Sequence, residues 1–369
     1  MTYPDFAPQW LADAEVAASG GDTFDKRCPM DDRLVARVAR GGAADARRAV
    51  DEASRAADTW SLTPPPLRGA ILSRAATLLR EREHEFGTIV QTETGKPWKS
   101  AVAEVASSAD LGVFMGSEGS RFYGKTMPSP ILHRTVQTIR QPIGICAALM
   151  PFNSPLAGVA WKVFPALVCG NAVVVKSHEL TPFTAIAFGH LLKDAGLPSG
   201  LYSVLQGLGP EVGAPLVEDN RVGIVSFTGS SATGKQIQKA VSERTVLAKV
   251  CLELGGKNPL VVCDDADLEN ADIESADLKG ASLAWANLQQ ANLRGACLKE
   301  ADLRWADMRR ANLSEADFRG ANLAGADLRD AILMGADFRG AKLKNTILEK
   351  RNSFSPAALK LRFKNNLKL

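Results

Sequence analysis

A strict five-residue repeat runs from residue 266 to residue 350 and limits what the second part of this chain can fold into. It has 17 pentads, beginning Ala-Asp-Leu-Glu-Asn and Ala-Asp-Ile-Glu-Ser, and the first position is Ala in 16 of them. A period of five matches neither the α-helix nor the two-residue alternation of a strand, so neither element could keep one face apolar. Four pentads can instead form one turn of a square coil whose third positions point inward.

The third position is apolar in every pentad and would fill the inside of such a coil beside the small alanines. These central residues are Leu268, Ile273, Leu278, Leu283, Leu288, Leu293, Leu298, Leu303, Met308, Leu313, Phe318, Leu323, Leu328, Leu333, Phe338, Leu343 and Leu348. The pattern over residues 266–350 closely resembles the pentapeptide-repeat family, and the resemblance implies a right-handed quadrilateral β-helix. It would have a little over four coils and be roughly 20 Å tall at about 4.8 Å per layer. A solenoid of this kind needs a cap at both ends.

The outward positions of the repeat are mixed in charge. Residues 266–350 hold 12 Lys/Arg and 14 Asp/Glu, and this near balance does not support the strongly acidic DNA mimicry of some pentapeptide-repeat proteins. Trp285 and Trp305 stand four pentads apart, so both would point outward on successive coils. They would form a surface ladder, contact the first domain, or mark a patch where a protein partner docks.

The final segment, residues 351–369, contains five Lys/Arg and no acidic residue. Ser355 and Pro356 suit an N-cap and a first helical turn, and Leu359 and Phe363 would share one helix face. We predict a short helix that caps the open end of the solenoid. The alternative is a basic tail that contacts nucleic acid or a membrane.

The first 265 residues follow a different pattern, in which short apolar runs alternate with segments of helical length. The runs cover residues 143–149, 172–175, 202–205, 222–227, 248–252 and 259–262, and the helices between them cover 156–167, 183–195 and 231–242. Buried β-branched strands that alternate with helices predict an α/β fold with a doubly wound parallel sheet. Such a sheet binds ligands at the carboxyl ends of its strands.

The region before that sheet is predicted to be mainly helical. Ala, Arg, Leu and Glu recur at helical spacing, residues 34–38 suit a short strand, and residues 133–141 alternate polar and apolar side chains as a half-exposed strand would. The predicted helices cover residues 43–57, 66 to about 93, and 100–116, and Gly95 and Pro97 are the stop signals of the second.

Four distinctive motifs follow four of the apolar runs. They are Met-Pro-Phe-Asn-Ser-Pro at 150–155, Lys-Ser-His-Glu at 176–179, Thr-Gly-Ser-Ser-Ala-Thr-Gly at 228–234 and Glu-Leu-Gly-Gly-Lys at 253–257. With Glu-Thr-Gly-Lys-Pro at 93–97, they closely resemble the aldehyde dehydrogenase superfamily over about residues 20–269. The resemblance implies the NAD(P)-binding domain of an oxidoreductase that converts an aldehyde to a carboxylic acid.

The resemblance implies roles for ten residues of this chain. Asn153 would donate a hydrogen bond to the oxyanion of a thiohemiacetal, and Glu253 would be the general base that activates water. Lys176 and Glu179 would hold the adenosine ribose. The remaining residues would border the dinucleotide, and they are Pro151 and Phe152 on the nicotinamide side, Phe227, Gly229 and Ser230 at the pyrophosphate, and Leu254.

Two residues of the first domain limit the class of nucleotide that it is expected to bind. The carboxylate of Glu179 can accept both ribose hydroxyls and would repel a 2′-phosphate, which favours NAD over NADP as the cofactor. Residues 229–235 mimic a nucleoside-triphosphate loop, but Gln236 stands where Ser or Thr would bind magnesium. His178 is interpreted as an exposed helix-start residue, and no metal site is predicted.

The resemblance also implies residues that this sequence does not contain. The family nucleophile is a cysteine in a Gly-Gln-x-Cys segment of a separate catalytic domain, and hydride leaves only after a thiolate attacks the carbonyl carbon. Here the only cysteine after residue 270 is Cys297, inside the repeat, and a Glu-x-Phe-Gly-Pro segment is missing as well. Cys251 and Cys263 lie in or beside predicted strands and do not replace the nucleophile.

The expected domains are therefore residues 1–265, with a bridging strand near 133–141, then the repeat at 266–350 and the basic segment at 351–369. Residues 264–270 satisfy both patterns, because the first pentad also fits the acidic turn after a strand. We interpret the chain as a truncated dehydrogenase-like protein that binds NAD(P) without turnover and carries the solenoid as a scaffold or interaction module. The alternatives are residual aldehyde dehydrogenase activity and an artificial or accidental fusion without a selected function.

Composition adds little to this interpretation. A net charge of +3 gives no clear sign of nucleic-acid binding, and no apolar run approaches the length of about 18 residues that spans a membrane. Six cysteines are scattered without Cys-x-x-Cys spacing, and no signal peptide is visible at the N-terminus. We expect a cytoplasmic protein, and the sequence leaves its oligomeric state and the aldehyde of the parent enzyme open.

Overall fold

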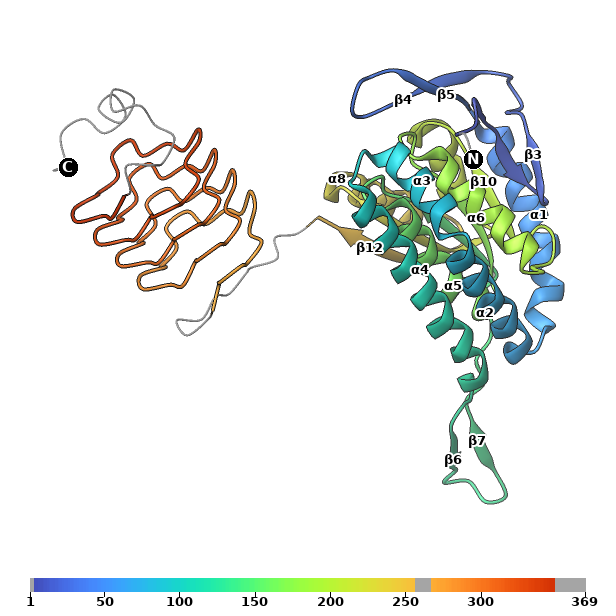
Figure 1. Cartoon of the computed structure of the whole chain (residues 1–369). Coiled ribbons are helices and arrows are strands. Elements are labelled where there is room, and N and C mark those ends of the chain that lie inside the picture. The colour runs from blue at the N-terminus through green and yellow to red at the C-terminus, as the bar shows by residue number, and fades with distance from the viewer. Residues whose placement is uncertain (1–2, 256–266, 349–369) are drawn as a thin grey trace. The chain divides into compact units, whose positions relative to one another are not determined.

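The computed structural model describes residues 3–255 and 267–348. The chain divides into two compact units, Met1–Gly256 and Lys257–Leu369, shown in Figure 1. Three features expected from the sequence lie outside the described residues: the strand at 259–262, Cys263, and the capping helix within 351–369.

The first unit is built on a seven-stranded sheet, and the prediction of a parallel α/β core is confirmed. Its strand order is β12-β11-β8-β9-β10-β2-β3, and the first five of these strands run parallel. Strands β8, β9 and β10 are buried along their whole length, as apolar runs covered on both faces should be. The five parallel strands are β8 (Ile145–Leu149), β9 (Ala172–Lys176), β10 (Tyr202–Leu205), β11 (Val222–Gly229) and β12 (Lys249–Leu254).

The sequence analysis found only one of the five strands near the N-terminus. Two of them, β2 (Gln9–Leu11) and β3 (Ala14–Val16), extend the main sheet in antiparallel fashion. The other three form a separate sheet in the order β1-β5-β4. They are β1 (Phe6–Ala7), β4 (Thr23–Arg27) and β5 (Leu34–Ala39), and only β5 was predicted.

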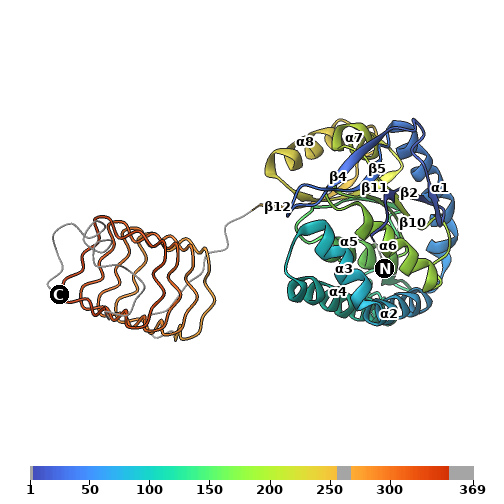
Figure 2. The same cartoon turned by 45° about the horizontal axis from the view of Figure 1, so that its top comes forward.

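Helices cover both faces of the main sheet. Helix α1 packs on β8, β9 and β10 and contacts α7, which in turn contacts α8. Helices α5 and α6 cover the opposite face, and α2, α3 and α4 pack outside them, as Figure 2 shows. The helices are α1 (Ala43–Leu62), α2 (Pro65–Glu81), α3 (Glu83–Thr94), α4 (Trp98–Glu118), α5 (Pro155–Val168), α6 (Pro182–Asp194), α7 (Ala214–Glu218) and α8 (Ser231–Ser242).

Two predictions about local structure needed correction. The single helix expected from residue 66 to about residue 93 is two helices, because the backbone leaves the helical range at Arg82, although the second of them ends at Thr94, before Gly95, as expected. The strand expected at 133–141 is only three residues long, β7 (Thr135–Gln137), and pairs with β6 (Thr126–Pro128) as an exposed hairpin.

The second unit is a stack of coils with four pentads per turn. Parallel bridges join second-position residues twenty apart, for example Asn287 to Asp307. The N–H of each third-position residue from Leu268 to Leu328 donates to the next coil, as Leu288 does to the carbonyl of Asp307 at 2.7 Å. Third-position side chains and first-position alanines from Leu288 to Leu328 are buried, so the predicted inward register is confirmed. Leu268, Ile273 and Leu278 are only partly buried, because they belong to the first coil of the described stack.

The outer surface of the stack holds two regular features. Five Asp-x-Arg pairs at pentad positions two and four form ion pairs, such as Arg329 with Asp327 at 2.6 Å. The indoles of Trp285 and Trp305 stack with their centroids 5.5 Å apart and remain 73% and 51% exposed. Trp305 lies directly over Gly325, where an added Cβ would collide with the indole.

None of the helices in the described part of the chain combines the length and the apolar character needed to span a lipid bilayer.

Candidate functional site

A cleft of about 1140 Å³ opens at the carboxyl ends of the parallel strands of the first unit. Its walls come from the ends of β8, β9, β11 and β12 and from the segments that follow β8, β9 and β10. All ten site residues chosen from the sequence line this one cleft. They are Pro151, Phe152, Asn153, Lys176, Glu179, Phe227, Gly229, Ser230, Glu253 and Leu254.

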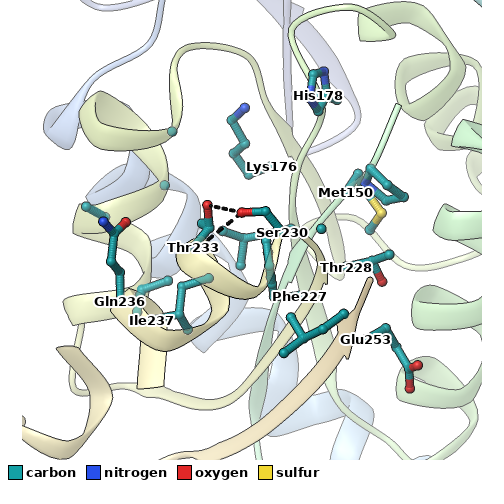
Figure 3. Close-up of a pocket in the computed structure, with 18 of the residues that line it drawn as sticks. Met150, Lys176, His178, Phe227, Thr228, Ser230, Thr233, Gln236, Ile237 and Glu253 are labelled. Carbon is teal, nitrogen blue, oxygen red and sulfur yellow. Dashed lines mark hydrogen bonds between the residues drawn. The ribbon is translucent and has the colours of Figure 1, made fainter. Parts of the chain in front are cut away.

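Two ends of the cleft can be told apart in Figure 3. Met150, Thr228 and Glu253 lie on one side, and Thr233, Gln236 and Ile237 of helix α8 lie on the other. Lys176 and His178 extend from the end of β9 between them. The two sides of the cleft therefore offer different side chains to a ligand.

At the end of β9, a lysine and a glutamate form an ion pair. Lys176 Nζ donates to Glu179 Oε2 at 2.8 Å, and the lysine side chain is only 7% exposed. Burial acts to raise the pKa of Glu179, but the charge and hydrogen bond of Lys176 outweigh it and hold that pKa below its ordinary value. The pKa of the neighbouring His178 is lowered, chiefly by burial. The pair thus presents an ionised carboxylate beside a largely buried ammonium.

The next strand ends in a helix N-terminus that faces the cleft. Strand β11 finishes at Gly229, and Ser230 caps helix α8 by accepting a hydrogen bond from the Thr233 N–H at 3.2 Å. Helix α8 packs closely on β12 at Gly234, where a side chain would not fit. A Cβ added there would come 2.6 Å from a methyl group of Leu254. The free N–H groups of the first turn make this point suited to an anion.

The turn after β8 carries two further predicted residues. Phe152 is exposed and its ring centroid lies 5.0 Å from that of His178. Asn153 is exposed and lies two residues before the start of helix α5, and its backbone carbonyl accepts a hydrogen bond from Lys96 Nζ at 2.9 Å. Asn153 is thus an exposed residue of the cleft wall.

Glu253 lies at the exposed end of β12, across the cleft from helix α8. The nearby buried lysine, Lys162, donates to Ser226 Oγ at 2.9 Å, and burial lowers its pKa despite the opposing charges of Cys146 and Glu253. Burial raises the pKa of the Cys146 thiol to about 12, so that thiol is a poor nucleophile near neutral pH.

Cys297 belongs to the repeat unit and not to the cleft. It occupies the second position of its pentad and bridges to Asp277 and Asp317 on the adjoining coils. Among the residues that the structure describes, no group of three His, Cys, Asp or Glu side chains could hold a metal ion.

One wall of the cleft was not predicted from the sequence. Gly209, Pro210 and Gly213 line it from a five-residue π-helical turn, Gly209–Gly213, and Ala214 and Val217 line it from α7. This segment follows β10, so the rule that ligands bind at strand carboxyl ends would have identified it.

Comparisons with known proteins agree with both parts of the sequence. The family model described as the aldehyde dehydrogenase family matches residues 16–276, and pentapeptide repeats match residues 266–304, 276–314 and 311–349. The chain is 37% identical over 260 residues to the 2,5-dioxopentanoate dehydrogenase of Saccharolobus solfataricus, covering 70% of this chain and 54% of that protein.

Solved structures give the same result. An indole-3-acetaldehyde dehydrogenase complexed with NAD+ is 36% identical with a TM-score of 0.66, covering 68% of this chain and 51% of the other. An NADP-dependent enzyme of E. coli is 34% identical with a TM-score of 0.69, covering 71% and 54%. The chain spans about half the length of the curated relatives it matches. Its first unit has their α/β fold, its second consists of pentapeptide repeats, and the chain belongs to the aldehyde dehydrogenase family.

Proposed function

We propose that the first unit is a dinucleotide-binding module that binds NAD, or more weakly NADP, in the cleft. The observation that carries this proposal is the convergence of an ion-paired ribose-binding set and a helix N-terminus on one cleft. Related structures bound to NAD+ and described as NADP-dependent support the same ligand class.

The residues present fit the three parts of a dinucleotide. The N-terminus of α8 suits the pyrophosphate, and the Lys176–Glu179 pair suits a ribose diol, since it offers a donor and an acceptor together. An apolar slot suits a flat adenine ring, and its lining residues are Pro210, Ala214, Val217, Ile237 and Ala240. The nicotinamide ring, which accepts hydride when the cofactor is bound, would then lie toward Phe152 and Glu253.

Binding can be tested with paired lysine variants. NADH fluorescence should rise saturably with the unaltered chain, and Lys176→Met should weaken the affinity about tenfold because a buried charged hydrogen bond is lost. Lys235→Met is the matched control, since Lys235 is an exposed lysine of α8 outside the cleft lining. Equal effects of the two variants would argue against the proposed site.

We further propose that this chain alone does not turn over aldehydes. Glu253 is exposed in the cleft, but the resemblance assigns it the hydrolysis of a thioester, and no cysteine is among the described residues that line the cleft. Incubation of the chain with NAD and an aldehyde panel should yield no NADH. NADH formation that is abolished by Glu253→Ala or Asn153→Ala would overturn this part of the proposal.

For the second unit we propose a right-handed quadrilateral β-helix over residues 266–350, acting as a scaffold or interaction module. A second candidate, a fusion without a selected joint function, is favoured by one observation. Among the described residues, the two hydrophobic cores share no member, one lying within residues 7–241 and the other within 283–343. Light scattering tests the fusion candidate, which predicts self-association, whereas a monodisperse monomer would count against it.

A further inference from the structure

A partly buried ion pair outside the cleft lining holds the turn that carries Asn153. Lys96 Nζ lies 2.6 Å from Glu104 Oε2 and donates to the carbonyl oxygen of Asn153 at 2.9 Å. The Lys96 side chain is 20% exposed and that of Glu104 only 6%. Neither residue touches the cleft, so neither was implicated by the motifs that follow the strands.

The second carboxylate oxygen of Glu104 is bound just as closely. Glu104 Oε1 accepts hydrogen bonds from the backbone N–H groups of Leu156 at 2.9 Å and Ala157 at 3.0 Å. These N–H groups belong to the first turn of α5, which has no side-chain cap of its own at Ser154. A carboxylate from α4 therefore takes the place of the missing N-cap.

The two halves of this arrangement act on the two sides of one short turn. Lys96 fixes the carbonyl of Asn153 before α5 begins, and Glu104 fixes the first N–H groups of α5 after it begins. Because Lys96 also pairs with Glu104, the lysine and the carboxylate form a closed network around residues 153–157. Moving either group would release the backbone of Asn153, a residue of the cleft wall.

We propose that Lys96 and Glu104 are a positioning pair that sets the shape of the nicotinamide end of the cleft. This inference rests on the proposed function, in which the turn from Met150 to Asn153 borders that end. The adenosine end is formed by other elements, namely the end of β9, the segment after β10, and α8. The pair therefore acts on one half of the dinucleotide and leaves the other half unaffected.

An effect on the binding of only one half of the dinucleotide distinguishes a positioning role of the pair from a purely structural role. A pair that only stabilises the packing of α4 on α5 would, when removed, lower the melting temperature without changing the affinity of the folded cleft. A general distortion of the unit would weaken every ligand. Selective loss of nicotinamide contacts in a folded variant is expected only if the pair shapes that end.

The test compares NADH with AMP on the full chain. Lys96→Met should raise the Kd for NADH about tenfold and reduce the enhancement of NADH emission, while the Kd for AMP stays within about twofold. Glu104→Gln should have the same selective effect but smaller, because the amide oxygen still accepts from the α5 N–H groups. Lys99→Met, at an exposed lysine near the start of α4, should change neither Kd.

Each outcome decides the question. Unchanged NADH affinity in Lys96→Met, or equal weakening of NADH and AMP, would overturn the inference. If Lys96→Met does not fold, Glu104→Gln supplies the same comparison, with its melting temperature measured beside it. Failure of the unaltered chain to bind either ligand would instead overturn the proposed function on which the inference depends.

Discussion

Lys176 and Glu179 form an ion pair of 2.8 Å at the carboxyl end of β9, with the lysine largely buried and the glutamate 34% exposed. The lysine holds the glutamate in its ionised form, since it lowers the pKa of Glu179 against the effect of burial. A fixed negative charge at this point distinguishes a free ribose 2′-hydroxyl from a 2′-phosphate. The position of this pair at the end of β9 is therefore expected to favour NAD over NADP.

Glu179→Gln should change the preference between the two dinucleotides. The neutral amide accepts ribose hydroxyls less strongly and no longer repels a phosphate, while Lys176 becomes free to attract one. We expect the ratio of the Kd for NADP to the Kd for NAD to fall about tenfold. Calorimetric titration of both ligands measures it, with Glu243→Gln at an exposed position after α8 as the control. An unchanged ratio would remove Glu179 from the ribose site.

A second prediction concerns pH and the buried Glu93 of α3. Its carboxylate accepts hydrogen bonds from the N–H groups of Phe183 and Thr184 at the start of α6 and from the Tyr3 hydroxyl. Burial raises the pKa of Glu93 from 4.5 to about 6, although these hydrogen bonds act to lower it. The folded state thus holds the proton more tightly, so this contribution to stability is complete below about pH 4.5 and is lost as the pH rises through about 6.

The loss corresponds to about 2 kcal/mol of unfolding free energy across that interval. Glu93→Gln cannot titrate, so its stability should depend less on pH between 5 and 7, although the variant is less stable because an amide cannot accept from every donor. Urea unfolding of the first unit at several pH values measures the difference. Glu83→Gln, at an exposed site in the same helix, should follow the unaltered chain. Parallel pH profiles for Glu93→Gln and the unaltered chain would contradict the assignment.

The fifth position of the pentads yields a third prediction. Its backbone is left-handed throughout the described repeat, including at residues other than glycine such as Gln290 with φ 57°. A side chain at positive φ is strained, so Gln290→Gly should stabilise the second unit, by about 0.5 kcal/mol after the entropic cost of glycine. Ala284→Gly, at a fourth position without positive φ, should destabilise it. Thermal unfolding compares the two, and the same sign for both would refute the explanation.

Independent unfolding of the two units is the fourth prediction. Their separate hydrophobic cores predict two calorimetric transitions and not one. Gln290→Gly should move only the transition of the repeat, and Glu93→Gln only that of the first unit. A single transition that both variants shift would show that the units unfold together.

The sequence predicted the parts of the fold that depend on local pattern. Buried apolar runs predicted β8 to β12, the limits of α8 were predicted to the residue, and the five-residue period predicted the inward register of Leu288 and its equivalents. The cleft residues were predictable because each follows a strand whose carboxyl end faces the same side of the sheet.

The features that escaped prediction depend on partners far away in the sequence. Strand β4 has no clear alternation and forms because it pairs with β5, and β2 joins the sheet through β10, almost two hundred residues away. The role of Glu104 could not be predicted, since the groups that donate hydrogen bonds to its carboxylate come from α5 and from the segment before α4. The left-handed backbone at the fifth pentad position could not be predicted from the sequence, because Trp, Gln and Glu occur there as well as Gly.

The central claim is that the cleft of the first unit binds a nicotinamide dinucleotide, although the chain alone does not oxidise aldehydes. Isothermal titration calorimetry of the full chain with NAD tests it most directly. We predict one saturable site per chain with a submillimolar Kd, weakened by Lys176→Met and unchanged by Lys235→Met. The absence of saturable heat up to millimolar NAD would contradict the account.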